Sequence, residues 1–264
     1  MTRASSPSFL DFVDKIRPGS YDAHSFKSEY SYLCYIALYQ FAMEFCENKT
    51  VLDAACGLGY GSYLLAQSAK KVTGIEIIAS NIDFSRQNYK KENLDYFVAD
   101  ATVMDFSDGQ FDAIVSIETF EHIPPEKALQ FLEEFRRVLK PGGTLVISTP
   151  NHDVYSQISR TPDHVNELNV DDFAALLCQV FDHCEPYYQR KGVLQTTGRY
   201  YSALKKDKLN LRRFVPRWIV EKIRSIAAPQ LQQSMQQTLQ QVQVHKAGNI
   251  DEVKDAVVQV WVCN

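Results

Sequence analysis

Short apolar runs alternate with longer amphipathic stretches over much of the chain. The runs fall at 51–54, 71–76, 95–99, 111–117 and 143–149, and each has the length of a buried strand. Apolar side chains recur at helical spacing between the runs, at about 60–69, 79–92 and 125–139. Strands that alternate with helices predict an α/β fold, in which helices cover both faces of a mostly parallel sheet.

The segments on either side of this alternation add helices and two late strands. Apolar side chains at helical spacing in 27–47 predict a helix with one face against the sheet. Asn169 has the position of an N-cap for a helix that runs to Val180, and strands are expected at 181–188 and 256–262. The predicted parts are a helical cap or lid at 1–50, a core at 51–189, a helical insertion at 190–250 and the last core strand at 251–264.

A glycine-rich turn follows the first strand. Asp53 ends that strand, Gly57, Gly59 and Gly61 come next, and a helix-like segment begins after them. Glycine lets the backbone take positive φ and approach a ligand closely. The free N–H groups at the start of a helix favour a carboxylate or a phosphate. The pattern is therefore typical of a loop that binds a nucleotide-like ligand.

Acidic residues stand at the ends of the following strands. Glu76 ends the second strand, Asp100 ends the third, and Glu118 follows the fourth. The carboxyl ends of parallel strands meet at one edge of the sheet, and ligands bind beyond that edge. An acid about 20 residues after a glycine turn is placed to bind ribose hydroxyls. We expect these carboxylates to lie near the glycine turn.

These motifs together resemble the class I S-adenosylmethionine-dependent methyltransferases, over roughly residues 51–182. The resemblance rests on Asp53-x-x-Cys-Gly-x-Gly, Glu76, Asp100, the run at 111–116 and Val138-Leu-Lys-Pro-Gly-Gly-Thr144. It implies a Rossmann-like, mostly parallel sheet of seven strands in the order 3-2-1-4-5-7-6. Strand 7 is antiparallel, and here a helical insertion precedes it.

The same resemblance implies S-adenosylmethionine as cofactor. Glu76 would bind the ribose hydroxyls, Asp100 the adenine amino group, and Asp53, Gly57 and Gly59 would frame the methionine end. The residues expected to bind the cofactor are Asp53, Ala55, Gly57, Leu58, Gly59, Glu76, Ile77, Asp100, Ala101 and Ile117.

A cluster of titratable residues follows the fourth strand. Glu118, Glu121 and His122 have i,i+3 and i,i+4 spacing, so they can converge on one helical turn. A hydroxyl acceptor of a methyl group must lose its proton, and His122 could act as the general base. A simpler interpretation is that the two glutamates and the histidine are polar residues at the start of a helix and have no catalytic role.

The cluster is also similar to that of the metal-dependent small-RNA 2′-O-methyltransferases, with Glu-x-x-Glu-His, a strand ending Ser148-Thr-Pro-Asn151 and a later histidine. Ubiquinone-pathway O-methyltransferases carry a similar Glu-x-x-Glu-His. This resemblance implies Mg²⁺ or another divalent cation held by Glu118, Glu121, His122 and His164. The alternative is that His122 acts alone and His164 packs locally. An RNA substrate is not inferred, because the chain has no recognisable RNA-binding module.

Charge and composition narrow the choice of partners. The net charge is −4, which does not favour nucleic acid as a partner. No signal peptide or membrane span is visible in the sequence, so we expect a cytoplasmic protein. The six cysteines form no C-x-x-C pair and are expected to be reduced.

The predicted insertion differs in charge from the rest of the chain. Between Arg199 and Arg224 it has nine basic residues against two acidic ones. Two interpretations stay open. The segment could form amphipathic helices with solvated faces, or it could bind an anionic acceptor or the surface of the inner membrane.

Several features recur together along the chain: Glu29 before the first predicted helix, Gly59-Tyr-Gly-Ser62, Ser148-Thr-Pro-Asn151, the segment 211–226 and a late last strand. This layout resembles that of bacterial methyltransferases that modify sugars and surface polysaccharides. We therefore predict O-methylation of a sugar hydroxyl, on a nucleotide-, lipid- or glycan-linked acceptor. The alternatives are a small-molecule O- or N-methyltransferase of quinone or natural-product type, and a non-catalytic S-adenosylmethionine-binding partner in a glycan-assembly complex. The oligomeric state is not predicted.

Overall fold

The computed structural model describes residues 29–158, 161–189, 237 and 239–264. The chain forms two compact units, one made of residues 1–34 and 192–242 and the other of residues 35–191 and 243–264. Most of the first unit, including the basic segment 199–224, lies outside the described residues. The fold below is that of the second unit.

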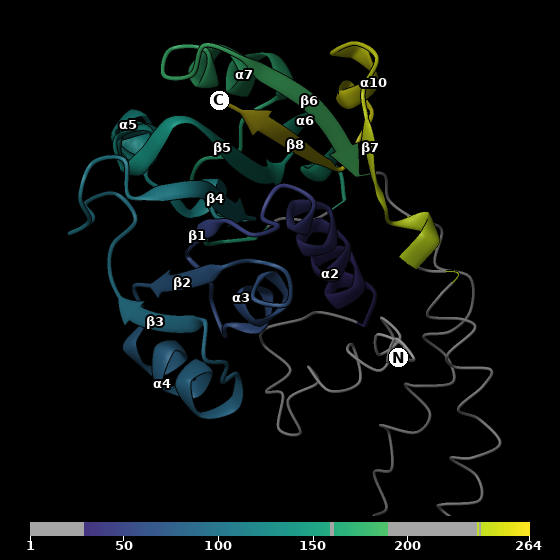
Figure 1. Cartoon of the computed structure of the whole chain (residues 1–264). Helices are drawn as coiled ribbons and strands as arrows, with labels where there is room; N and C mark the ends of the chain where they lie inside the picture. The colour runs from purple at the N-terminus through teal and green to yellow at the C-terminus, as the bar shows by residue number, and fades with distance from the viewer. Residues whose placement is uncertain (1–28, 159–160, 190–236, 238) are drawn as a thin grey trace, which may run out of the picture. The chain divides into compact units, whose positions relative to one another are not determined.

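One mixed sheet forms the centre of this unit (Figure 1). Its strand order is β3-β2-β1-β4-β5-β8-β6-β7. Neighbours among β1 to β5 pair in parallel, whereas β8 runs antiparallel to both β5 and β6. The strands are β1 (Thr50–Ala54), β2 (Lys71–Glu76), β3 (Leu94–Val98), β4 (Phe111–Ile117), β5 (Leu139–Pro150), β6 (Cys184–Gln189), β7 (Val244–Lys246) and β8 (Val258–Cys263).

The predicted α/β fold and strand order are confirmed, with one difference. Within the described residues the sheet has eight strands, because β7 adds to β6 at its outer edge. β7 lies near the end of the segment predicted to be an insertion, and its residues Val244, His245 and Lys246 are not an apolar run that would predict a strand. Strand β8 has the place and the antiparallel direction expected for strand 7.

The helices lie close to where the sequence predicted them. They are α2 (Glu29–Met43), α3 (Tyr60–Leu65), α4 (Ala79–Asn88), α5 (Ala128–Val138), α6 (His152–Tyr155), α7 (Val170–Leu177) and α10 (Asp251–Lys254), with short 3₁₀ helices η1 (Phe120–His122) and η2 (Pro125–Lys127). Asn169 caps α7 as predicted, because its side chain accepts a hydrogen bond from the Asp172 N–H at 2.9 Å. Helix α5 buries Phe131, Phe135 and Val138 completely in the main core.

Helix α2 packs on the start of α3 through Tyr39. A Cβ added at Gly61 would overlap the Tyr39 ring, so only glycine fits there without movement of the ring. The Tyr39 hydroxyl donates to Asp53 Oδ1 at 3.2 Å, and the Ser62 hydroxyl donates to Asp53 Oδ2 at 2.6 Å. Helix α2 is thereby joined to the end of β1.

Two of the cysteines pair in a disulfide, contrary to the expectation that all six are reduced. Cys184 of β6 and Cys263 of β8 lie directly opposite each other in the antiparallel register, which brings their side chains together. Within the described ranges, Cys46, Cys56 and Cys178 have free thiol groups. None of the described helices combines the length and the hydrophobicity needed to cross a membrane.

Candidate functional site

Two of the three glycines after β1 have the positive φ that the sequence suggested, and Gly61 lies within α3. Ala55, Gly57 and Gly59 have φ values of 60°, 55° and 83°. A Cβ added at Gly59 would meet Ser85 and Tyr96, so this glycine lets the turn lie close to α4 and β3. A Cβ added at Gly57 would meet nothing within 4 Å. Gly57 therefore exposes its backbone to open space, where a ligand can approach closely.

Glu76 joins this turn to the end of β2. Its Oε2 accepts a hydrogen bond from the Gly57 N–H at 3.1 Å, and its Oε1 accepts one from the Ile78 N–H at 3.0 Å. Each carboxylate oxygen has two lone pairs, so both can accept further bonds from a ligand. The neighbouring Ile77 and Ile78 side chains are 63% and 52% exposed. A fixed carboxylate beside exposed apolar side chains suits a ligand with a polar and a flat apolar part.

Asp100 shapes the loop after β3. Its Oδ1 accepts hydrogen bonds from both the backbone N–H and the hydroxyl of Thr102, each at 2.8 Å, and Oδ2 is left with its acceptor capacity. Ala101 is buried, while Val103 is 64% exposed. Ile117, at the end of β4, is buried.

Asp53 occupies a different environment from the other two acids. It is fully buried, and its oxygens accept from Tyr39 and Ser62. Burial raises the pKa of its carboxyl group to about 7, and the two hydroxyl donors partly offset that shift. Asp53 therefore stabilises the glycine turn through hydrogen bonds from the hydroxyl groups of Tyr39 and Ser62.

The segment after β4 is not the single helical turn that the spacing suggested. Glu118 has φ 50° and precedes η1, which contains only residues 120–122. Ile123 is extended because Pro124 follows it, and this ends the short helix. Glu118 Oε1 accepts a hydrogen bond from the Ser148 hydroxyl at 2.9 Å. Burial raises the pKa of Glu118 to about 7, and the charge of Glu167 adds to this shift.

Glu121 is the buried centre of the cluster. Its Oε2 accepts a hydrogen bond from the Thr149 hydroxyl at 3.0 Å. Burial raises the pKa of its carboxyl group, with further contributions from Glu118 and Glu167. Its backbone oxygen accepts from the N–H groups of Val165 and Asn166 at 2.8 and 3.0 Å. These two bonds bring the 161–167 loop, and with it His164, to the end of β4.

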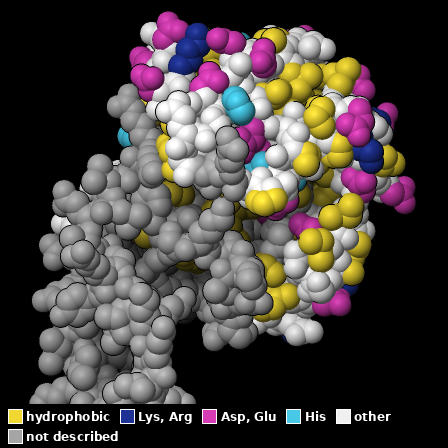
Figure 2. Space-filling model, turned by 180° about the vertical axis from the view of Figure 1, so that it is seen from behind, with side chains coloured by type: hydrophobic (Ala, Val, Ile, Leu, Met, Phe, Trp, Pro, Cys, Tyr) yellow, Lys and Arg dark blue, Asp and Glu magenta, His cyan; other side chains and the backbone are white. Residues whose placement is uncertain are grey.

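Three of the four residues predicted to bind a metal come together. One potential ligand atom each from Glu121, His122 and His164 lies within 4.8 Å of the other two. The His122 and His164 rings are 4.9 Å apart between centroids and nearly perpendicular. Glu118 is not one of the three, because its carboxylate turns to Ser148 of β5. One carboxylate and two imidazoles are a donor set that suits a divalent transition metal. Figure 2 shows histidine and acidic side chains exposed on the same face of the molecule.

The comparisons with known proteins agree with this architecture. Residues 52–147 match the protein family described as a methyltransferase domain. A probable S-adenosylmethionine-dependent methyltransferase of Mycolicibacterium smegmatis is 32% identical over 143 residues, which cover 53% of this chain and 54% of that protein. The ubiquinone biosynthesis O-methyltransferase of Dictyostelium discoideum is 32% identical over 128 residues, 43% of this chain and 39% of that enzyme. Residues 52–147 of this chain therefore form a methyltransferase domain.

Solved structures support the fold of this domain. The structure of an S-adenosylmethionine-dependent methyltransferase of Thermotoga maritima has a TM-score of 0.59 and covers 88% of this chain and 89% of its own, at 12% identity. At that identity the likeness shows the fold alone. The alignments span about half the length of the first curated relatives.

The methyltransferase domain implies S-adenosylmethionine as its cofactor, and the residues at the glycine turn fit that molecule. The open space above Gly57 suits a close approach by the methionine end. Glu76 and Asp100 have acceptor capacity for the ribose hydroxyls and the adenine amino group, next to exposed apolar side chains at the ends of β2 and β3. The cofactor when bound supplies an activated methyl group on a sulfonium.

The structure also brings into the site several residues that no sequence motif predicts. Tyr39 stands in the segment before the glycine turn, and no motif marks it as the partner of Asp53. Thr149 lies in a segment that the sequence singled out, but its bond to Glu121 depends on the pairing of β4 with β5. Glu167 ends the loop that carries His164 and contacts that histidine, which the spacing of the two residues makes possible without predicting it.

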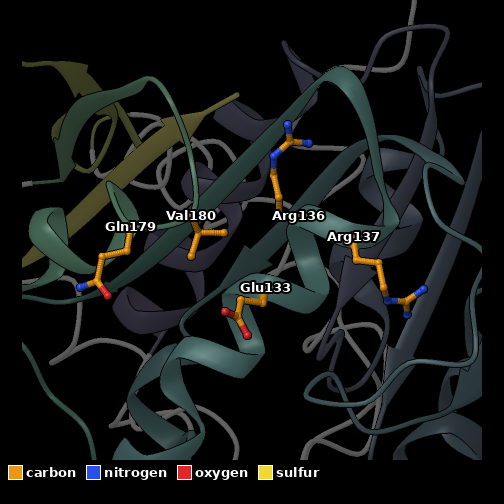
Figure 3. A pocket seen from close by; sticks show the side chains of 5 residues that line it. All are labelled: Glu133, Arg136, Arg137, Gln179 and Val180. Carbon is orange, nitrogen blue, oxygen red and sulfur yellow. The ribbon is translucent and has the colours of Figure 1, made fainter.

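A surface cavity elsewhere does not belong to this site. It has a volume of about 490 Å³ and is lined by Glu133, Arg136, Arg137, Gln179 and Val180 (Figure 3). The figure shows Arg136 and Arg137 pointing in different directions. Arg137 is already bound to Glu134 and Asp108 and to the carbonyl groups of Met104 and Phe106. The side chains do not converge on a ligand position.

Proposed function

We propose that this protein transfers the methyl group of S-adenosylmethionine to a hydroxyl group, which it activates with a divalent cation held by Glu121, His122 and His164. The observation that carries the proposal is the convergence of ligand atoms from these residues within 4.8 Å of one another. Strand β4, which precedes the cluster, pairs directly with β1, which leads into the glycine turn. The acceptor hydroxyl would therefore lie close to the methyl group of the cofactor.

The chain's own residues would prepare the acceptor in three ways. The Thr149 hydroxyl holds Glu121 in one orientation, so that its other oxygen can face the acceptor site. Glu118 and Glu121 both have raised pKa values because they are buried. A divalent cation, when bound, would favour their charged forms, lower the pKa of a hydroxyl that binds it, and hold a second, vicinal oxygen in place. Without a cation, His122 is the residue that could take the proton.

For the acceptor we propose a sugar with vicinal hydroxyl groups, because the layout of the chain resembles methyltransferases that modify sugars. The predicted anionic group on this acceptor depends on the basic segment 199–224, which is outside the described residues. A second candidate is a quinol or catechol, which also presents vicinal oxygens. It is favoured by the relatives that are named ubiquinone biosynthesis O-methyltransferases in Dictyostelium discoideum and Idiomarina loihiensis.

The test is an acceptor screen with methyl-labelled S-adenosylmethionine against nucleotide sugars, glycans and catechols. Each active acceptor is assayed again after removal of metal with EDTA, and then after addition of Mg²⁺ or Mn²⁺. We expect transfer of label that chelation abolishes and the cation restores. Transfer that survives thorough chelation would contradict the cation and leave His122 as the base. A wild-type protein that binds the cofactor but methylates no acceptor would favour the non-catalytic alternative.

A further inference from the structure

We propose that Glu167 is a positioning residue that holds His164 in one tautomer, with the proton on Nδ1 and Nε2 free to bind the cation. The part about the cation rests on the proposed function, whereas the tautomer is a property of the protein alone. The proposal starts from the fact that a neutral imidazole has one nitrogen that donates a hydrogen bond and one that can act as a ligand. The hydrogen-bond partner of one nitrogen determines which nitrogen carries the proton and which keeps a lone pair for a cation.

The partner of His122 fixes its tautomer without ambiguity. Its Nδ1 lies 3.0 Å from the backbone oxygen of Asp163. A carbonyl oxygen can only accept a hydrogen bond, so Nδ1 must carry the proton. The nitrogen of His122 that keeps a lone pair is therefore Nε2.

His164 reaches the same arrangement through a side chain. Its Nδ1 lies 2.6 Å from Glu167 Oε1, a short distance typical of a bond to a charged acceptor. The ring is almost fully buried, with 9% of the side chain exposed, and it stacks on the Tyr155 ring at 5.4 Å between centroids. The ring is thus confined by packing, and Glu167 supplies the group that selects which nitrogen holds the proton.

A second histidine lies next to Glu167. Its second oxygen lies 3.6 Å from Nδ1 of His152, at the start of α6, so the carboxylate lies between two histidines. The 161–167 loop is tied to Glu121 by the bonds from Val165 and Asn166. One loop therefore provides the backbone acceptor for His122, the carboxylate acceptor for His164 and the tether to the carboxylate ligand.

The tautomers can be measured directly by NMR on protein labelled with ¹⁵N-histidine, through long-range ¹H–¹⁵N correlations in mildly alkaline buffer without added metal. Signals are assigned with His122→Asn and His164→Asn. In the wild-type protein we expect both histidines to carry the proton on Nδ1. In Glu167→Ala we expect His164 to shift toward the Nε2–H form, while His122 keeps its form because its partner is a backbone carbonyl. Glu167→Gln should restore the wild-type form, because the amide oxygen can accept the same bond.

A matched control is Glu185→Ala. It removes a carboxylate on β6 that pairs with another histidine, His183, just before that strand. It should leave both tautomers unchanged. Titration with Mn²⁺, followed by calorimetry, should show affinity about 10–100-fold lower in Glu167→Ala than in the wild-type protein, with a smaller loss in Glu167→Gln. Binding of S-adenosylhomocysteine should be the same in all variants.

Several outcomes would overturn the assignment. The first is a wild-type His164 that is doubly protonated or has its proton on Nε2. The second is a Glu167→Ala spectrum in which the His164 signals are unchanged. The third is a change at His122 in Glu167→Ala as large as that at His164, which would mean that Glu167 stabilises the whole loop and not the His164 ring. If the wild-type protein has the expected tautomers but binds no Mn²⁺, the proposed cation site fails and the role of Glu167 toward His164 stands.

Discussion

Replacing Asp53 with asparagine removes a carboxyl group that burial holds partly protonated near neutral pH. The pKa of Asp53 rises from 3.8 to about 7 on folding, because the residue is fully buried, and the hydroxyl groups of Ser62 and Tyr39 only partly compensate. Because the folded-state pKa is above that of the unfolded chain, the native state binds more protons between these two values. The free energy of unfolding of the wild-type protein therefore falls as pH rises through this window.

The size of the effect follows from the width of the window. Each pH unit between the two pKa values changes the free energy of unfolding by about 1.4 kcal/mol. Between pH 5 and pH 7, Asp53 should lower the stability of the wild-type protein by roughly 2–3 kcal/mol, and asparagine removes this contribution. From pH 5 to pH 7, the free energy of unfolding of Asp53→Asn should therefore increase by that amount relative to that of the wild-type protein.

Urea unfolding at pH 5, 6, 7 and 8 measures this difference. Asp95→Asn makes the same chemical change at an exposed position on β3 and serves as the control. We expect the difference to level off above about pH 7, where the native carboxyl group is also ionised. A difference that stays constant from pH 5 to pH 8 would refute the reasoning. It would mean that the donors Tyr39 and Ser62 outweigh burial and keep Asp53 charged.

Three further predictions concern the cofactor, the packing of α2 and the cluster. Glu76→Ala should lower the affinity for S-adenosylhomocysteine by roughly 10–100-fold, the cost of losing a charged hydrogen-bond acceptor; wild-type affinity in calorimetry would contradict the role of Glu76. Gly61→Ala should destabilise the protein by about 1–3 kcal/mol in urea unfolding, because the added methyl group overlaps the buried Tyr39 ring. An unchanged urea midpoint would show that α2 can move to accommodate the methyl group. His164→Ala should reduce turnover nearly as much as His122→Ala and leave cofactor binding intact, whereas normal turnover in His164→Ala would reject a shared role.

The sheet was predictable because its strands are apolar runs of the right length. Strands β2 and β4 begin and end at the predicted residues. Strand β5 begins earlier than predicted, at Leu139, since Lys140, Pro141 and Gly142 do not resemble a strand in sequence. That start pairs with β4 only through a shift in register near Phe111, which is a property of the assembled sheet.

The cluster was predictable in its membership more than in its geometry. The spacing of Glu118, Glu121 and His122 suggested one helical turn, and Pro124 already indicated that this turn could not continue as helix through residue 123. The positive φ of Glu118 and its bond to Ser148 could not be predicted, because they depend on how β4 and β5 align. The pairing of Cys184 with Cys263 has the same origin, since the two residues become neighbours only in the register of β6 and β8.

The position of β8 has a consequence for how the chain can fold during synthesis. This strand begins at Val258, after β6 has ended at Gln189, yet it lies between β5 and β6. Until the ribosome has released it, the outer edge of β5 has no partner, and β6 and β7 have no sheet to join. Unpaired strand edges are templates for association with other chains. Nascent chains that stop before β8 should therefore depend on chaperones and aggregate readily, whereas the part from β1 to β5 can assemble early through its parallel pairs.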